Sequence, residues 1–312
     1  MTESIYTHIS NSDGLPLKVL RIEPDDPKDI KGIVQFVHGK NEHKGRYRDI
    51  MRFLADKGYM TVIHDNRGHG ESVLAPDDRG YMYEGGYKAL IDDIYEITLD
   101  AKRRADFMCT GRRLPVTLIG HSMGSMAARC YLIGHDREID KLCVVGSPSF
   151  RFTVPGGVLL LSLMSLIEGD RTRSKLANKL IMENGYGRID EVEGLHNAWT
   201  NTDREAVIKK NNDPMCKFVF TLNGYKNMVS LSLLTYCKAY RAKNKDLKIR
   251  FYSGSDDPCM VTKRKLKRSM WLLRLKGYKD VKGKLFKGMR HDILNEKKKE
   301  RVWKEILKFI ES

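Results

Sequence analysis

A serine lies at the centre of the pentapeptide Gly120-His121-Ser122-Met123-Gly124, a G-x-S-x-G pattern. The pattern follows the apolar run Pro115–Gly120, which predicts a strand, and precedes a small-residue run to about Gly134, which predicts a helix. A strand that turns sharply into a helix strains the backbone at its central residue, and glycines on either side avoid collisions with neighbouring elements. The turn presents the Ser122 hydroxyl at a helix N-terminus, where developing negative charge is stabilised. We therefore predict that Ser122 is a nucleophile.

A nucleophilic serine needs a histidine as its base and a carboxylate that orients the histidine. When the serine occupies such a turn, the acid and the histidine follow it in that order along the chain. Asp257 comes just after the predicted strand Leu247–Gly254, and His291 comes after a predicted strand that ends near Phe286. Both lie at carboxyl ends of strands, where ligands bind in open α/β sheets. We predict Asp257 as the acid and His291 as the base.

Two alternatives accompany this assignment. Asp256 is adjacent to Asp257, only one of the two can face the histidine, and Asp-Asp-Pro is also a good turn sequence. We prefer Asp257 and keep Asp256 open. Four other histidines lie at predicted strand ends but precede Ser122 in the chain, so they have the wrong order for the base: His38, His64, His69 and His121.

The segment His38-Gly39-Lys40 follows the predicted strand Gly32–His38, where this arrangement places a second oxyanion donor. We predict that the backbone N–H groups of Lys40 and Met123 form the oxyanion hole, without a need for the lysine side chain. The alternative is that His38-Gly39 only ends a strand.

Strand patterns alternate with helical patterns along most of the chain, which is typical of an α/β fold with a mostly parallel sheet. Further strands are predicted at Tyr59–Asp65, Lys141–Pro148 and Gly283–Phe286, and further helices near 47–55, 90–101, 262–276 and 302–309. The alternation stops for roughly 75 residues after Phe150. We predict a core formed by residues 1–149 and 226–312, with residues 150–225 inserted as a helical cap.

The chain has 312 residues, of which 41% are hydrophobic and 31% charged, and this composition excludes collagen-like and largely disordered classes. The formal net charge is +16, but residues 261–312 hold 18 Lys and Arg against 6 Asp and Glu. The six cysteines show no CxxC spacing, which argues against a zinc knuckle. The N-terminus lacks the features of a signal peptide, and no apolar run reaches the roughly 20 residues of a membrane span. We expect a cytoplasmic protein.

These residues resemble the α/β-hydrolase superfamily, and within it the serine hydrolases of the monoacylglycerol lipase and lysophospholipase type, over essentially the whole chain. HGKNEHKGRY (38–47) is similar to that branch's H-G-x-x-E-H-x-G-R-Y, and HDNRGHGES (64–72) to its D-x-x-G-H-G-x-S turn. GHSMGS resembles the nucleophile segment, and GSDDP and RHDILNE resemble the acid and histidine segments, the latter in its bacterial form. The resemblance implies an α/β-hydrolase fold and hydrolysis of acyl esters.

The resemblance also implies roles for individual residues. It implies Ser122, Asp257 and His291 as the triad and Lys40 and Met123 as oxyanion donors. Glu42 and Arg46 would lie near the polar end of the pocket, where monoacylglycerol lipases hold glycerol hydroxyls, although an i, i+4 surface pair is an alternative. This sequence has Leu294 where those lipases place a second histidine that helps to bind glycerol, so the resemblance does not extend to that contact.

The expected substrate is a small-molecule acyl ester, and no metal or organic cofactor is required. The run Val158–Ile167 has eight apolar residues of ten, so it could line an acyl tunnel, dip into a membrane interface or pack inside the cap. A related aminopeptidase is one rival, with Glu183, Asp190, Glu191 and Glu193 available to bind a substrate amine. A membrane-binding scaffold is another, and the basic runs at 263–268 and 297–299 would then face anionic lipid. We expect peripheral contact with an anionic membrane at most, no nucleic-acid partner, and no particular oligomeric state.

Overall fold

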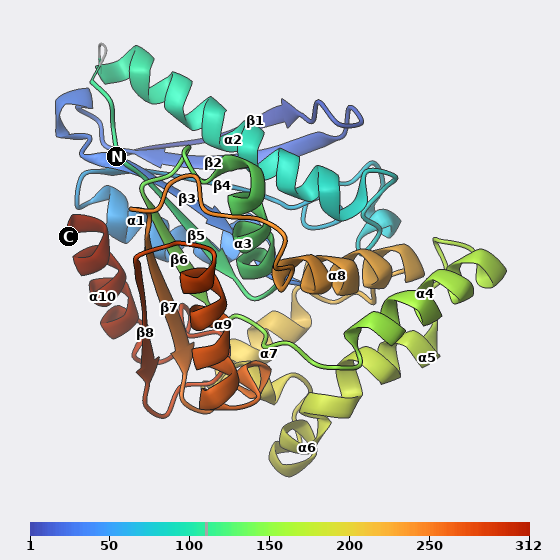
Figure 1. Ribbon diagram of the computed structural model, residues 1–312. Coiled ribbons are helices and arrows are strands. Elements are labelled where there is room, and N and C mark those ends of the chain that lie inside the picture. Colours follow the sequence, from blue (N-terminus) through green and yellow to red (C-terminus); the bar gives the residue numbers. More distant parts are fainter. Residues whose placement is uncertain (110–111) are drawn as a thin grey trace.

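Eight strands form a single sheet in the order β1-β2-β4-β3-β5-β6-β7-β8 (Figure 1). This computed structural model describes residues 1–109 and 112–312, and only the backbone of 182–187. The strands β3 to β8 run parallel, whereas β1 and β2 are antiparallel to their neighbours. The bounds of the strands are β1 Thr2–Ile9, β2 Pro16–Glu23, β3 Gly32–Val37, β4 Tyr59–His64, β5 Val116–His121, β6 Lys141–Val145, β7 Lys248–Gly254 and β8 Asp280–Phe286. The predicted α/β class and mostly parallel sheet are confirmed.

Helices cover both faces of the sheet. The α-helices are α1 Arg48–Ala55, α2 Gly86–Cys109, α3 Met123–His135, α4 Val154–Glu168, α5 Lys175–Asn178, α6 Asn184–Glu193, α7 Arg204–Asn212, α8 Leu222–Thr235, α9 Lys263–Leu275 and α10 Lys299–Glu311. Short 3₁₀ turns lie at Pro27–Asp29, Lys44–Tyr47, Pro76–Asp78, Ala198–Thr200 and Pro258–Met260, and a π-helical turn at Lys179–Glu183.

Strand β3 shows how the alternation of side chains builds two cores. Val34 and Phe36 point to the face where α1 and α10 pack, and both belong to one buried apolar cluster. Ile33 and Val37 point to the opposite face and belong to a second cluster, which α2, α3, α8 and α9 help to form. Because all six residues of β3 are buried, the strand is an almost continuous apolar run, as expected for a parallel strand covered on both faces.

The chain between β6 and β7 is helical. In Figure 1, α4, α5 and α6 lie together at one side of the molecule, away from the sheet. Helix α8 contacts α4 on one side and α2 and α3 on the other, so it joins this group to the helices that cover the sheet. Residue 226 lies inside α8. The division into a core and a cap at that residue stays a prediction.

The N-terminal hairpin of β1 and β2 is absent from the predicted elements. The side chains of β1 alternate between exposed and partly buried, and Ile5 and Ile9 are both more than half exposed. An edge strand of this kind has no apolar run to mark it. In the described chain, no helix is both long and apolar enough to cross a membrane.

Candidate active site

Ser122 lies in the tight turn that joins β5 to α3. Its backbone has φ 52° and ψ −117°, a conformation that costs a residue with a side chain about 1–3 kcal/mol. The strain is held by neighbours: the Ser122 N–H donates to the carbonyl of Val145 at 2.9 Å, and the Ser125 hydroxyl donates to the Ser122 carbonyl at 2.6 Å. Ser122 also lines the large cavity described below.

The two glycines of the G-x-S-x-G pattern lie where a side chain would not fit. A Cβ atom at Gly120 would lie 2.4 Å from the carbonyl oxygen of Gly124, and one at Gly124 would lie 2.2 Å from the carbonyl oxygen of Val37. These atoms belong to the backbone and cannot move aside as a flexible side chain could. The steric reason predicted for both glycines is present in the fold.

His291 and Asp257 lie side by side. The Nδ1 atom of His291 is 3.0 Å from Oδ1 of Asp257, and both residues are buried. The Asp257 carboxylate also accepts from the Cys259 N–H at 2.8 Å and from the Ser253 hydroxyl at 2.9 Å. Asp256 is exposed, and its carboxylate accepts from the Ser255 hydroxyl. The geometry therefore favours Asp257 over Asp256 as the partner of the histidine.

The Asp257 carboxylate is adapted to stay charged. Burial alone would raise its pKa, but the neighbouring His291 and the hydrogen bonds from Cys259 and Ser253 outweigh burial and hold the pKa below its usual value. A carboxylate so placed keeps the Nδ1 proton of His291 and leaves Nε2 available to accept a proton.

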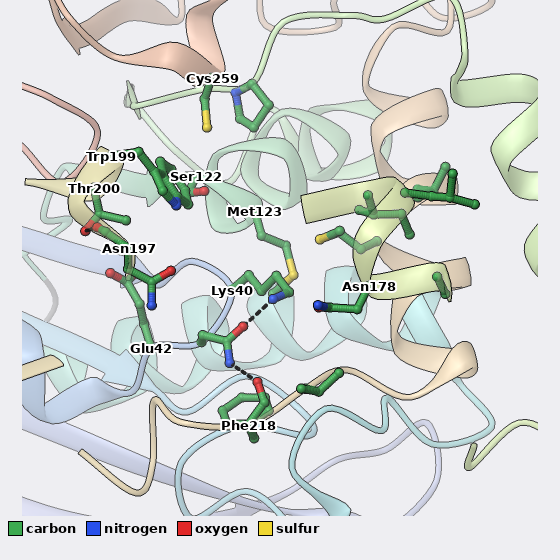
Figure 2. Close-up of a pocket in the computed structure, with 18 of the residues that line it drawn as sticks. Lys40, Glu42, Ser122, Met123, Asn178, Asn197, Trp199, Thr200, Phe218 and Cys259 are labelled. Carbon is green, nitrogen blue, oxygen red and sulfur yellow. Dashed lines mark hydrogen bonds between the residues drawn. The ribbon is translucent and has the colours of Figure 1, made fainter. Parts of the chain in front are cut away.

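One cavity of about 2080 Å³ contains both Ser122 and His291 in its wall. It is larger than the roughly 300–1,000 Å³ of a typical small-molecule pocket. Two residues not considered in the sequence analysis also lie there: Cys259, whose Sγ is 4.0 Å from Nε2 of His291, and Trp199, whose ring centroid is 5.1 Å from that of His291. Figure 2 shows Ser122 and Trp199 close together in this pocket.

The loop after β3 passes directly beside the serine. A Cβ atom at Gly39 would lie 3.0 Å from Cβ of Ser122, which is closer than almost all Cβ contacts, so the absence of a side chain eases this approach. Lys40 is the next residue, and Met123 is the first residue of α3. In the part of the chain that the structure describes, neither the Lys40 N–H nor the Met123 N–H donates to another protein group. Both are therefore available to the oxyanion of a substrate.

Glu42 lies at the cavity wall but is buried in a polar network. Its Oε2 atom accepts from the Gly39 N–H and the Tyr47 hydroxyl, each at 2.8 Å, and lies 3.0 Å from Nδ1 of His121. Burial alone would raise the pKa of Glu42, but His121 and Lys210 outweigh burial and hold it well below its usual range. The carboxylate is thus a charged anchor for the loop that carries Gly39.

Arg46 is not among the described residues that line the cavity. Its Nη2 atom lies 2.5 Å from Oδ2 of Asp292, and its Nε atom lies 3.6 Å from Oε1 of Glu42. The pair with Glu42 is buried, because only 14% of the Arg46 side chain and 1% of the Glu42 side chain are exposed. On the cavity side, Lys210 approaches Glu42, with Nζ 3.7 Å from Oε1. Sequence analysis had no signal for Lys210.

Three groups of described side chains bring potential metal ligands within 4.8 Å of one another, namely His43, Asp213 and Cys216; Asp257, Cys259 and His291; and Glu42, His121 and Asp292. In the first group the Gly45 N–H donates to Nδ1 of His43, so its Nε2 carries the proton that faces Asp213. In the other two groups, the histidine Nδ1 atom already faces a carboxylate. A metal ion would have to replace these hydrogen bonds.

The acidic residues expected for an aminopeptidase are dispersed. The Asp190 carboxylate accepts from the backbone N–H groups of Asn197 and Trp199, and Glu193 pairs with Arg290 at 2.6 Å. Glu191 is exposed at the cavity wall. The side chain of Glu183 lies outside the described residues.

A family profile described as "Serine aminopeptidase, S33" (Hydrolase_4) matches residues 28–298. Monoglyceride lipase from Homo sapiens is 30% identical over 122 residues, which are 39% of this chain and 36% of that protein. Probable lysophospholipase L2 from Haemophilus influenzae is 25% identical over 154 residues, which are 48% of this chain and 46% of that protein. The chain thus spans less than half the length of these curated relatives.

The fold is also similar to that of solved structures. A thermostable carboxyl esterase from Bacillus coagulans, solved in complex with glycerol, superposes with a TM-score of 0.87 at 22% sequence identity. The superposition covers 100% of this chain and 98% of the esterase, so the similarity of fold extends over both chains.

Proposed function

The chain belongs to the Hydrolase_4 family of α/β-hydrolases, described as serine aminopeptidase S33, and from this premise we propose that it hydrolyses carboxylic esters of acyl lipids. The substrates would be of the monoacylglycerol or lysophospholipid type, as the names of the human and Haemophilus relatives suggest. One observation carries the proposal. Ser122 and His291 line the same cavity, and Asp257 lies behind His291 with 3.0 Å between their facing atoms.

In the proposed reaction, Nε2 of His291 takes the proton of the Ser122 hydroxyl as its oxygen attacks the ester carbonyl. The negative charge of the tetrahedral intermediate rests on the N–H groups of Lys40 and Met123. The C–O bond to the alcohol then breaks, and His291 protonates the leaving oxygen. Water, deprotonated by the same histidine, attacks the acyl-enzyme and releases the carboxylic acid and free Ser122. Asp257 holds the histidine in the tautomer that both steps need.

The lining of the cavity supports a lipid acyl group. Residues of α4 and α8 contribute apolar side chains to the wall, among them Leu160, Leu161, Met164 and Val229. Long and flexible side chains such as Leu and Met adapt to an alkyl chain. An aminopeptidase would instead need a carboxylate free to bind the substrate amine. Asp190 and Glu193 are engaged elsewhere, whereas Glu191 is exposed at the cavity wall, so the aminoacyl anilides of the panel below test this alternative.

A hydrolysis panel tests this proposal. It compares 4-nitrophenyl esters, monoacylglycerols, lysophospholipids and aminoacyl anilides in the wild-type protein and in Ser122→Ala. We expect hydrolysis of the acyl esters and a loss of about 10⁴-fold or more in kcat in the variant. Activity that survives in Ser122→Ala would contradict the mechanism, and preference for the anilides would assign the protein to the peptidases.

Peripheral contact with a membrane is a second candidate function, and α4 favours it. Four apolar residues of this helix are between 50% and 84% exposed, namely Leu159, Leu163, Leu166 and Ile167. Their neighbours Leu161 and Met164 line the cavity. An apolar face beside the pocket would let an acyl lipid pass from a bilayer towards Ser122.

A further inference from the structure

The side chain of Lys40 enters the cavity beside the serine. The residue directly follows Gly39, where an added Cβ atom would lie 3.0 Å from Cβ of Ser122, and Lys40 itself lines the cavity wall. Its ammonium lies 4.7 Å from the centre of the Phe220 ring and donates to the Asn41 side-chain oxygen. Figure 2 shows the amine end of Lys40 turned towards the part of the pocket where Asn178 lies. The residue thus places a cation among largely apolar walls.

This ammonium has no anionic partner. Among the side chains that the structure describes, no carboxylate lies within 4 Å of Lys40, although 19 of the other lysines and arginines form such pairs. Its hydrogen bond goes to a neutral amide that is itself fixed by the carbonyls of Cys216 and Phe218. Burial, and after it the charge of Lys210, lower the pKa of Lys40 to about 7. Lys40 is partly buried, and a cation withdrawn from water without a counterion is costly; an anion brought by a ligand would reduce that cost.

The rest of the cavity has the same sign. Seven lysines and arginines line it against four acidic residues, counted over the described side chains: Lys40, Arg79, Arg151, Arg173, Arg188, Lys210 and Lys217 against Glu42, Asp77, Asp190 and Glu191. Two of the four acidic groups already have protein partners: Glu42 pairs with Arg46 and Lys210, and the Asp190 carboxylate accepts a backbone hydrogen bond. The cavity therefore offers a positive potential to a substrate.

We propose that the Lys40 ammonium recognises an anionic oxygen group of the substrate, so that the preferred ester carries a phosphate or carboxylate within reach of this side chain. The inference rests on the proposed ester hydrolysis and narrows its substrate class. The backbone N–H of Lys40 would bind the oxyanion of the reacting carbonyl, while the side chain of the same residue binds the permanent charge. If Lys40 only packed over the Phe220 ring, its replacement would affect the hydrolysis of charged and neutral esters equally.

The test compares kcat/KM within two pairs of esters. In the first, a lysophosphatidylglycerol is set against a monoacylglycerol with the same acyl chain, so that the charge lies on the alcohol side. In the second, the 4-nitrophenyl monoester of adipic acid is set against 4-nitrophenyl hexanoate, so that the charge lies on the acyl side. The proteins are the wild type, Lys40→Met, Lys40→Arg and the control Lys245→Met, which removes an exposed lysine that does not line the cavity.

We expect the wild type to prefer the charged ester in one pair, and that pair shows which side of the ester carries the anion. Lys40→Met should lower the charged-to-neutral ratio about tenfold or more, as expected for a hydrogen bond to a charged group. Lys40→Arg and Lys245→Met should keep the ratio. Because it is a ratio within one protein, a general loss of activity in Lys40→Met does not affect it. A wild type that hydrolyses charged and neutral esters equally well, or an unchanged ratio in Lys40→Met, would overturn the role of Lys40. Neither result would contradict the proposed ester hydrolysis.

A measurement without turnover separates the two proposals further. Calorimetric titration of Ser122→Ala with lysophosphatidylglycerol in buffers of different ionisation enthalpy reports protons taken up on binding. A bound phosphodiester should raise the pKa of Lys40, so we expect proton uptake near pH 8 that is absent in Ser122→Ala combined with Lys40→Met. Equal proton uptake in both would overturn the role of Lys40, whereas ester hydrolysis that does not depend on Ser122 would instead overturn the proposed function.

Discussion

The Nε2 atom of His121 lies 3.3 Å from the carbonyl oxygen of His291, and the two imidazole rings lie 4.9 Å apart. On the opposite side of its ring, Nδ1 of His121 lies 3.0 Å from Oε2 of Glu42. The backbone of the proposed base is therefore linked, through the residue next to the nucleophile, to a buried carboxylate on the loop after β3. This relationship assigns Glu42 a positioning role beside the predicted one in substrate binding.

Replacing Glu42 with glutamine should destabilise the protein and slow catalysis together. The change removes the charge that faces His121, Arg46 and Lys210 in a buried site, and breaking a buried pair costs about 3–5 kcal/mol. We expect a clear drop in thermal midpoint and in kcat for Glu42→Gln. The control Glu305→Gln removes the partly exposed partner of the exposed Lys284 and should change stability by no more than about 0.5 kcal/mol. Equal stability of the two variants would contradict the role of the network.

The pair of His121 and Glu42 predicts how stability depends on pH. Burial alone would lower the pKa of His121, but Glu42 outweighs burial and raises it above 6.5. A histidine whose pKa is raised on folding stabilises the fold fully below its unfolded pKa, and this stabilisation is lost as pH rises through the folded pKa. Because the pKa of Lys40 is lowered to about 7 in the folded protein, Lys40 makes stability rise with pH above 7, which opposes the contribution of His121. The effect of His121 is therefore measured as the difference in stability between the wild type and Glu42→Gln at each pH. We expect the stability difference between wild type and Glu42→Gln, measured by denaturant unfolding, to shrink as pH rises above about 6.5.

Replacing Asp257 with asparagine should lower kcat by about 10⁴-fold, because the amide would favour the wrong tautomer of His291. Asp256→Asn is the matched control, since Asp256 is exposed and faces Ser255. Steady-state hydrolysis of a 4-nitrophenyl ester measures both variants. If Asp256→Asn were the more damaging change, the acid would have to be reassigned to Asp256.

The sheet could be predicted from sequence where strands are buried on both faces. β3, β4 and β5 consist only of buried residues, so each is an apolar run that needs no context to recognise. β1 could not be predicted, because its side chains lie mostly at the surface of the sheet edge. The strand before His291 begins at Asp280, three residues before the predicted start, because Lys282 and Lys284 on its exposed positions hide the pattern.

The residues of the candidate site likewise fall into those that could be predicted from sequence and those that could not. Ser122, Asp257 and His291 could be selected because local sequence and chain order constrain them, and the structure brings Asp257 and His291 together. Trp199 and Lys210 could not be selected, since they reach the cavity only through the packing of the inserted helices on the sheet. The partial burial of Lys40 likewise depends on Phe220, which is 180 residues away in the chain.

The glycine of the serine turn offers a test of the backbone geometry. Gly124→Ala would place a methyl group 2.2 Å from the carbonyl oxygen of Val37, so we expect severe destabilisation and loss of activity. Gly134→Ala lies in the same helix, α3, with nothing within 4 Å of the new methyl group, and alanine favours a helix by about 0.8–1 kcal/mol. The midpoint temperature of thermal denaturation should therefore fall in Gly124→Ala and rise or stay unchanged in Gly134→Ala. A Gly124→Ala protein as stable as the wild type would contradict the close approach of α3 to β3.

The exposed face of α4 predicts binding to lipid vesicles. We expect the wild type to co-sediment with vesicles and the double variant Leu166→Asp, Ile167→Asp to bind at least about tenfold more weakly, because burying each large apolar side chain contributes about 1.5–3 kcal/mol. Phe107→Asp is the control, since Phe107 is 81% exposed but lies on α2, outside this face. Binding should be stronger to anionic than to neutral vesicles and should weaken with salt if Lys263, Arg264 and their neighbours also contribute, because salt screens exposed charges. Binding that does not change with salt would exclude a contribution of the basic helix and leave α4 as the contact. A loss of vesicle binding in Phe107→Asp as large as that in the double variant would contradict the role of α4.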